Sequence, residues 1–272
     1  MVSAHQISLE ELSLEEAYDI CANETTLQLS DKATKKVIAC RAYLDNKINA
    51  TSEPIYGINT GFGSLYDRNI SPTELSKLQE NLVKSHACGA GDEVPTHIIR
   101  CMLFLKIQSL AYGHSGVQLE TIQRLIEYFN HGITPVVYEM GSLGASGDLA
   151  PLAHLSLPLL GLGQVWYKNN LYSGEEINQI FEWKPIKFKA KEGLALLNGT
   201  QLMGAYGLYC SVQASKLVKL ANLLGALSLD TFDGRIEPFY EEIHKIRPHN
   251  GQISVAKSIR NILSGSEIIS QP

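Results

Sequence analysis

The sequence lacks the cysteine pattern of a metal or dithiol site. Its five cysteines are scattered, and no two of them are spaced as a C-x-x-C pair. Zinc sites and dithiol motifs depend on such close pairs. We therefore expect no metal and interpret the cysteines as reduced, mostly buried thiols: Cys21, Cys40, Cys88, Cys101 and Cys210.

An excess of positive charge is also missing. The chain carries 23 Lys and Arg against 28 Asp and Glu, a formal net charge of -5, and it contains no dense basic run. Proteins that bind nucleic acid need a positive field to neutralise phosphates. Nucleic acid is therefore excluded as an expected partner.

Long apolar runs are absent as well. The most apolar stretch, residues 149–162, is interrupted by Pro151, His154 and Pro158 and is too short to span a bilayer. The first 16 residues are polar and acidic, unlike a secretory signal. We expect a cytoplasmic protein with no membrane segment.

The remaining composition is typical of a folded globular protein. The 272 residues are 44% hydrophobic and 19% charged, which suits one large or two modest domains with a substantial core. Composition therefore indicates a folded globular protein, and only individual motifs can indicate its function.

Helical spacing of apolar residues dominates the chain. Ser71-Pro72-Thr73-Glu74 has the pattern of a capping box, and a helix from there should end near residues 89–91, with Ser85 and His86 in its last turns. Pro95 should open a second helix, and a third should cover residues 117–129.

The second half of the chain shows one long helix and one hairpin. Residues 201–229 carry the longest apolar helical pattern, and residues 163–172 are the main β signal. Residues 173–191 are polar enough to be a surface connection, so we place a domain boundary near residue 190. The long helix has few local partners, so we expect other subunits, or chain beyond Pro272, to cover it.

Residues 141–148, Gly-Ser-Leu-Gly-Ala-Ser-Gly-Asp, form a loop of small residues. By composition alone it is a turn whose Asp148 caps the following helix. The spacing fits neither G-x-x-x-x-G-K-[ST] nor G-x-G-x-x-G. We therefore expect no nucleotide at this loop.

Ala145-Ser146-Gly147, the triad, also permits an unusual backbone reaction. The Gly147 nitrogen has no neighbouring Cβ, and the Ala145 carbonyl is shielded only by a methyl group. A five-membered ring can close between them. Loss of two waters, one of them from the Ser146 hydroxyl, leaves a methylidene group conjugated to a carbonyl, which is an electrophile that no standard side chain supplies.

Residues 141–155, GSLGASGDLAPLAHL, resemble the signature of the histidine and phenylalanine ammonia-lyase family. Three further segments resemble that family in the same order, so the match covers nearly all of the chain from about residue 50. The resemblance implies that the triad forms 4-methylidene-imidazol-5-one (MIO) autocatalytically. It also implies a homotetramer and a mainly α, multihelical ammonia-lyase-like (aspartase-like) fold with minor β.

In that fold, residues 1–190 would be an N-terminal mixed domain that bears the triad. Residues 191–272 would start the central bundle of long helices, truncated relative to the family. Complete members continue for about as long again, and that half carries a tyrosine, a carboxylate-binding arginine and a glutamate. Arg235 and Arg247 lack the matching motif, so neither is assigned as the carboxylate clamp.

The three other segments supply the remaining candidate residues. Residues 56–63, YGINTGFG, resemble the family's tyrosine loop, which makes Tyr56 the candidate base. Without the family, Tyr56 would be a core tyrosine in a Gly-rich turn, because the ordinary pKa of tyrosine is about 10.

Residues 81–87, NLVKSHA, resemble the segment whose Ser-His pair, here Ser85 and His86, contacts the substrate side chain. An imidazole would leave an unpaired polar group against a phenyl ring, so His86 disfavours phenylalanine and allows histidine or tyrosine. The other seven histidines, His114 and His154 among them, are interpreted as structural.

Residues 194–201, LALLNGTQ, resemble the segment whose asparagine, here Asn198, bonds the prosthetic group or the substrate carboxylate. The structural alternative is that Asn198 caps the long helix, and the two roles are compatible.

The resemblance predicts a lyase whose partner is a small-molecule amino acid substrate, L-histidine, from which it removes ammonia to give urocanate. Two alternatives stay open. One is a tyrosine ammonia-lyase or an aromatic 2,3-aminomutase with the same cofactor. The other is a truncated, non-catalytic homologue, since the 272 residues lack the other half of the family's site.

Overall fold

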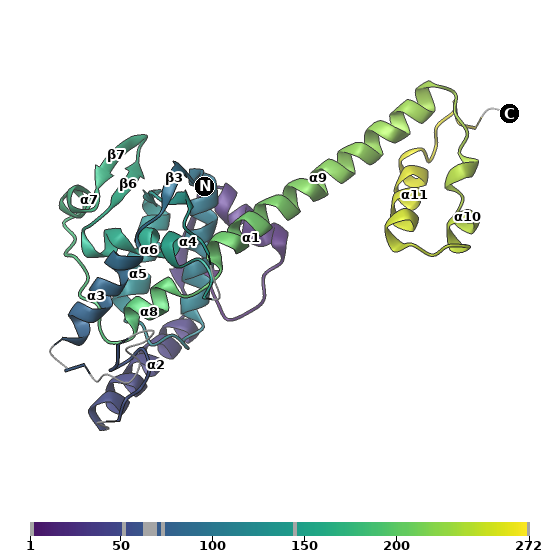
Figure 1. Ribbon diagram of the computed structural model, residues 1–272. Helices are drawn as coiled ribbons and strands as arrows, with labels where there is room; N and C mark the ends of the chain where they lie inside the picture. The colour runs from purple at the N-terminus through teal and green to yellow at the C-terminus, as the bar shows by residue number, and fades with distance from the viewer. Residues whose placement is uncertain (1–2, 51–52, 62–69, 72–73, 144–145, 271–272) are drawn as a thin grey trace. The chain divides into compact units, whose positions relative to one another are not determined.

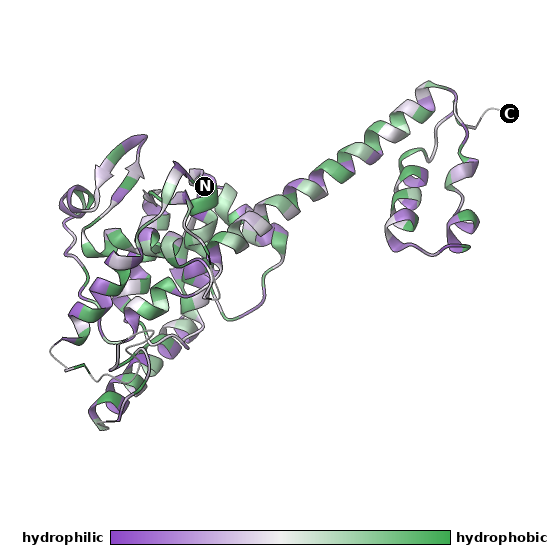
Figure 2. Cartoon of the chain, viewed as in Figure 1, coloured by the Kyte–Doolittle hydropathy of each residue, from purple (hydrophilic) through white to green (hydrophobic). Residues whose placement is uncertain are grey.

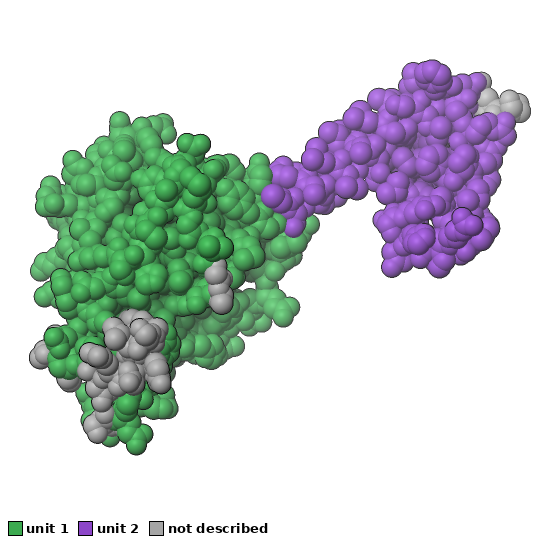
Figure 3. Space-filling model, in the orientation of Figure 1, with its two compact units in different colours: residues 1–209 green, residues 210–272 purple. Residues whose placement is uncertain are grey.

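The computed structural model describes residues 3–50, 53–61, 70–71, 74–143 and 146–270. Its contacts divide the chain into two compact units, residues 1–209 and 210–272 (Figure 3). The boundary expected near residue 190 stays a prediction. Both units are mainly helical, as the sequence predicts (Figure 1).

The first unit is built from helices with short strands between them. Its helices are α1 (Leu14–Ala22), α2 (Asp31–Ala50), α3 (Leu75–His86), α4 (Thr96–Ala111), α5 (Leu119–His131), α6 (Leu149–Ser156), the 3-10 helix η2 (Leu157–Leu160), α7 (Gly174–Ile180), α8 (Glu192–Leu197) and the start of α9 (Gln201–Thr231). The core is centred on α4, which is apolar on most sides; Met102, Phe104 and Ile107 are fully buried.

Within the described residues, the strands form three small sheets. β1 (Ser3–Ile7) pairs in parallel with β2 (Thr25–Leu29), and β3 (Ala90–Glu93) pairs with β5 (Tyr138–Met140) in antiparallel fashion. β4 (Thr134–Pro135), β6 (Gln164–Tyr167) and β7 (Asn170–Ser173) form the third sheet. The sequence predicts only the β6–β7 hairpin, whose turn residues Lys168 and Asn169 both have positive φ.

The predicted helix ends are mostly confirmed. Helix α3 ends at His86 and α4 follows Pro95. The start of α3 differs from the expectation: it begins at Leu75, and Glu74 makes no capping bond to the helix but accepts a hydrogen bond from Ser71 Oγ at 2.6 Å. Pro72 and Thr73 lie outside the described residues.

The expectation of a polar surface connection over residues 173–191 is wrong. Its first part forms α7, which begins with a capping box between Ser173 and Glu176. Ile177, Ile186 and Phe188 on this stretch are buried. These three residues are irregularly spaced in the sequence, so they form no periodic apolar pattern, although all three are part of the core.

The second unit contains the rest of α9, the 3-10 helix η3 (Glu237–Phe239), α10 (Glu241–Lys245) and α11 (Asn250–Ile262). Its small core joins Ala226 of α9 to Ile259 and Leu263. Hydrophobic residues recur along α9 (Figure 2). In this unit its residues of about half exposure or more include Leu217, Val218, Leu220, Leu223, Leu224 and Leu227.

Two expectations from composition can be compared with the structure. All five cysteines are free, but only Cys21 and Cys101 are buried, so the expectation of mostly buried thiols is wrong. Over the described residues, no helix has the length and hydrophobicity needed to cross a bilayer, and no three potential metal ligands gather.

Glu192, the first residue of α8, anchors this helix to its surroundings. Its fully buried carboxylate accepts four hydrogen bonds, from Gln118 N and Nε2, Thr121 Oγ1 and Lys189 N, at 2.6–2.8 Å. These bonds fix the start of the short helix that leads to the candidate site.

We expect Glu192→Leu to lower the free energy of unfolding by about 3 kcal/mol or more, because four donors would lose their acceptor in the interior. Denaturant unfolding measures this loss. Glu120→Leu removes an exposed carboxylate on α5 and should change stability by less than about 0.5 kcal/mol. Equal effects of the two substitutions would contradict this account of Glu192.

Candidate functional site

The triad loop is joined to the segment that carries Asn198 by backbone pairing. Gly147 and Gly199 form a parallel bridge, and the Asp148 amide donates to the Gly199 carbonyl at 2.8 Å. Gly147 has φ +86°, and a Cβ there would overlap the Gly199 carbonyl oxygen. Glycine alone adopts this positive φ without strain and has no Cβ to collide with the Gly199 carbonyl. Ser146 beside it is exposed, whereas Ala145 and Gly144 lie outside the described residues.

Asp148 does not cap the helix that follows it, contrary to the structural interpretation of the sequence. It occupies the N-cap position of α6 but makes no side-chain bond to that helix. Its buried carboxylate instead accepts the Leu202 and Met203 amides of α9, at 2.8 and 3.1 Å, and the Ser142 hydroxyl at 2.7 Å. Asp148 thus fixes the triad loop against the N-terminus of the long helix.

Asn198 caps α8 rather than α9, so the interpretation of Asn198 as the cap of the long helix is wrong. Its backbone amide and its Nδ2 both donate to the Leu194 carbonyl, at 3.1 and 3.0 Å. The side chain is exposed. Because Nδ2 is turned toward a carbonyl, Oδ1 is the atom left to accept from another group.

Ser85 and His86 lie in the last turn of α3, as predicted. His86 Nδ1 is 2.8 Å from the Leu82 carbonyl oxygen and 3.2 Å from Ser85 Oγ, which itself donates to the same carbonyl at 3.0 Å. A carbonyl only accepts, so Nδ1 carries the proton. In the neutral ring, Nε2 is therefore an acceptor.

Two contacts tie the end of α3 to the triad loop. The β3–β5 ladder joins the strand after His86 to the strand before residue 141. His154 of α6 accepts the Gly89 amide through Nε2 at 3.0 Å and packs edge-on against Tyr138. His154 is therefore structural, as expected, and α3, α6 and α8 pack against one another (Figure 1).

Tyr56 lies in a turn that packs near the other end of α3. Ile58 of this turn is buried with Leu75, and Asn59 Oδ1 accepts the Ile55 amide at 2.6 Å. The Tyr56 side chain is 56% exposed. Phe62 and Gly63 of the same motif lie outside the described residues.

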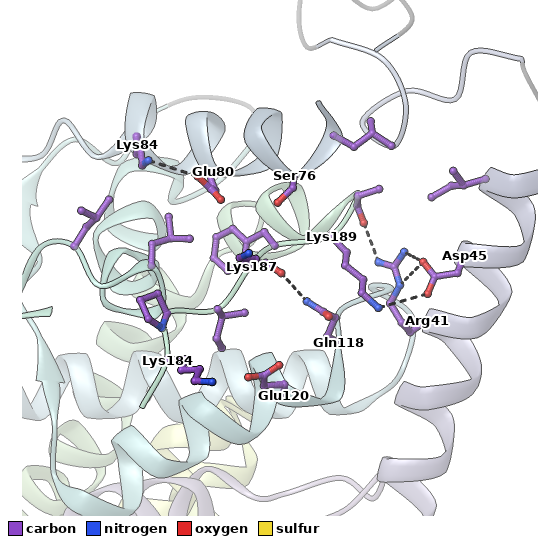
Figure 4. Close-up of a pocket in the computed structure, with 18 of the residues that line it drawn as sticks. Arg41, Asp45, Ser76, Glu80, Lys84, Gln118, Glu120, Lys184, Lys187 and Lys189 are labelled. Carbon is purple, nitrogen blue, oxygen red and sulfur yellow. Dashed lines mark hydrogen bonds and ion pairs between the residues drawn. The ribbon is translucent and has the colours of Figure 1, made fainter. Parts of the chain in front are cut away.

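A separate groove of about 990 Å³ lies between α2, α3 and residues 184–190. Its polar side chains include Arg41 paired with Asp45, and Lys84 paired with Glu80 (Figure 4). Of the predicted catalytic and substrate-binding residues that the structure describes, none lines it. The triad, Ser85–His86 and Asn198 therefore define the candidate site without this groove.

The packing of His154 predicts a pH dependence of stability. Burial lowers the pKa of His154 below its ordinary value of 6.5, so below pH 6.5 the unfolded chain binds more protons than the folded chain. The stability that the neutral ring contributes is present above pH 6.5 and is lost as the pH falls through the lowered pKa.

We expect His154→Gln, which keeps an acceptor for Gly89, to reduce the fall in unfolding free energy between pH 7 and pH 5. Urea unfolding at the two pH values measures it. His114→Gln, at an exposed ring, should retain the wild-type fall. If His154→Gln also retains it, this role of His154 is wrong.

Comparison with known proteins agrees with this architecture. The family model described as aromatic amino acid lyase matches residues 12–272. Histidine ammonia-lyase of Streptococcus pyogenes serotype M49 (strain NZ131) is 45% identical over 258 residues, which are 95% of this chain and 50% of that protein.

Solved structures give the same result. A histidine ammonia-lyase from Trypanosoma cruzi has a TM-score of 0.84 at 35% identity, over 96% of this chain and 50% of that one. A tyrosine aminomutase from Streptomyces globisporus has a TM-score of 0.88 at 30% identity, over 97% and 49%. This chain spans about half the length of the curated relatives that it matches. The fold, the order of the motifs and these matches together show that the chain belongs to the aromatic amino acid lyase family.

Proposed function

We propose that this chain supplies the triad-bearing half of an ammonia-lyase that acts on L-histidine and releases ammonia and urocanate. The observation that carries the proposal is the Gly147–Gly199 pairing, which sets the triad loop beside Asn198. The similarity to histidine ammonia-lyases over 95% of the chain supports the choice of substrate.

The described residues fit MIO formation at the triad. Gly147 has no Cβ to hinder its nitrogen, and in the described contacts that nitrogen donates to no other group. Its positive φ and the Asp148–Gly199 bond bend the loop tightly. Once formed, MIO would supply an electrophile to which the substrate amine adds, so that the nitrogen becomes a leaving group.

In this proposal Tyr56 removes the β-proton, and Asn198 orients the carboxylate or the oxygen of the prosthetic group through its second Nδ2 hydrogen, the first being donated to Leu194. Asn198 lies three residues before Gln201, the first residue of α9. The Leu202 and Met203 amides at the start of α9 already donate to the Asp148 carboxylate. In this proposal Asn198 therefore acts on the carboxylate through its side chain.

His86 gives the site a hydrogen-bond acceptor for the substrate side chain. Its Nδ1 proton is directed at Leu82, which leaves Nε2 to accept from a substrate donor. A histidine imidazole N–H and a tyrosine hydroxyl can both donate to it, whereas a phenyl ring cannot. Tyrosine ammonia-lyase or aromatic 2,3-aminomutase activity is therefore the second candidate, and the similarity to the Streptomyces globisporus enzyme favours it.

The substrate assay uses the chain with any residues that its gene encodes beyond Pro272. We expect ammonia release from histidine to exceed release from tyrosine, and His86→Leu to lower kcat/KM for histidine at least about tenfold. His114→Leu is the matched control. Turnover of tyrosine alone would replace the first candidate with the second, and a folded chain that acts on neither would favour a non-catalytic homologue.

A homotetramer and a cytoplasmic location are part of the same proposal. The half-exposed leucines of α9 form an apolar surface that subunit association would cover. Light scattering coupled to size exclusion measures the subunit number, and a monomer at micromolar concentration would contradict the assembly.

A further inference from the structure

A buried lysine lies directly behind the Asn198 segment. Lys106, on α4, is 1% exposed although it carries an ionisable amine. Burial alone lowers the pKa of Lys106 to about 7. Among the described ion pairs, none involves this residue. A lysine in such a position is costly to bury, so the bonds that it makes have to offset the loss of water.

The Lys106 amine bonds to the C-terminal end of α8. Its Nζ donates to the Ala195 carbonyl at 2.7 Å and to the Asn198 carbonyl at 3.1 Å. The last carbonyls of a helix have no partners within the helix, and they favour a positive group. Lys106 therefore supplies a donor to two backbone acceptors at the end of α8.

Asn198 is held through both its backbone and its side chain. The amide and Nδ2 of Asn198 are bound to Leu194, and its carbonyl is bound to Lys106. The next residue is Gly199, whose carbonyl accepts the Asp148 amide. A continuous set of contacts thus runs from Lys106 through Asn198 and Gly199 to the triad loop.

We propose that Lys106 is a positioning residue for the triad and for Asn198: its amine holds the Asn198–Gly199 turn in the place where Gly199 pairs with Gly147. The role of this turn in catalysis rests on the proposed function, whereas the link from Lys106 to the pairing can be measured separately. Lys106 does not touch the reacting atoms in this account; it acts through Asn198 and Gly199.

The test compares Lys106→Met, which removes every donor, with Lys106→Gln, which keeps an amide donor on a shorter side chain. The matched control is Lys191→Met. Lys191 donates to the Ser115 carbonyl at 2.7 Å and precedes the opposite end of α8. All variants are compared at a temperature where circular dichroism shows them fully folded.

The first readout is hydrogen exchange at the Asp148 amide. We expect exchange to be about tenfold faster in Lys106→Met, intermediate in Lys106→Gln, and unchanged in Lys191→Met. The second readout is the fraction of chains that have lost two waters, by intact mass, which should fall in the same order. In steady-state kinetics, Lys106→Met should lower kcat by a larger factor than it changes KM.

The proposal would be overturned if folded Lys106→Met had the same exchange rate at the Asp148 amide, the same ring content and the same kcat as the wild type. Equal losses in Lys191→Met would also overturn it, because the effect would then be a general one of destabilising α8. The proposed function fails separately, if the wild-type chain keeps its full mass or if Asn198→Ala retains full kcat. In that case, hydrogen exchange at the Asp148 amide in the Lys106 variants still shows whether Lys106 holds the Gly147–Gly199 pairing.

Discussion

Gly147→Ala is expected to abolish ring formation and, with it, ammonia release. An alanine at φ +86° is strained, and its Cβ would overlap the Gly199 carbonyl oxygen. That oxygen is backbone, already bound to the Asp148 amide, so it cannot move aside as a flexible side chain would. The pairing between the two loops must open, and the added methyl also hinders the Gly147 nitrogen.

Gly132→Ala is the control that separates the backbone strain of a positive φ from the steric overlap with Gly199. Gly132 ends α5 with φ +67°, and a Cβ there meets nothing within 4 Å. Both alanines pay the cost of a left-handed backbone, about 1–2 kcal/mol, but only the one at 147 should prevent loss of the two waters. Intact mass gives the outcome. Complete ring formation in Gly147→Ala would show that the close approach to Gly199 is unimportant.

Asp148→Leu should have the second largest effect. Its carboxylate is the acceptor for two α9 amides and for Ser142, all around a side chain that is 2% exposed. Leaving these donors unpaired should lower the free energy of unfolding by about 2–5 kcal/mol. Because the same bonds fix the loop that holds Gly147, we also expect ring formation to fail in the folded fraction.

Asp148→Asn keeps one oxygen acceptor, so its stability and ring content should lie between those of Asp148→Leu and the wild type. Ser173→Ala is the control, since it removes an exposed cap at α7, costs about 1 kcal/mol and should leave ring formation intact. Denaturant unfolding and intact mass are measured on each variant. An Asp148→Leu chain with wild-type stability would contradict the assigned hydrogen bonds.

The sequence predicts local features of this fold better than long-range ones. Helix α4 and the 168–169 turn are encoded by neighbouring residues, so both are predicted correctly. The parallel β1–β2 pair and the β3–β5 pair join segments far apart in the chain, and the four residues of β3 are all exposed. Neither pair leaves an alternation of apolar residues that could be recognised.

The site shows the same division. The sequence predicts that Asp148 caps its own helix, because a cap is the nearest explanation for an aspartate before an apolar run, whereas the two backbone amides that it accepts lie more than fifty residues away. Lys106 does leave a signal, as one of two Lys or Arg residues in the largely apolar helix Thr96–Ala111, but its role is not predicted from the sequence. The roles of Tyr56 and His86 came from family resemblance, since neither spacing nor composition distinguishes them from structural residues.

The most direct test of the account is the intact mass of the folded chain, with peptide mapping across residues 141–155. Condensation of Ala145-Ser146-Gly147 predicts a loss of two waters confined to the peptide that holds the triad, and no such loss in Ser146→Ala. A folded, active wild-type chain whose triad peptide keeps its full linear mass would contradict the central claim.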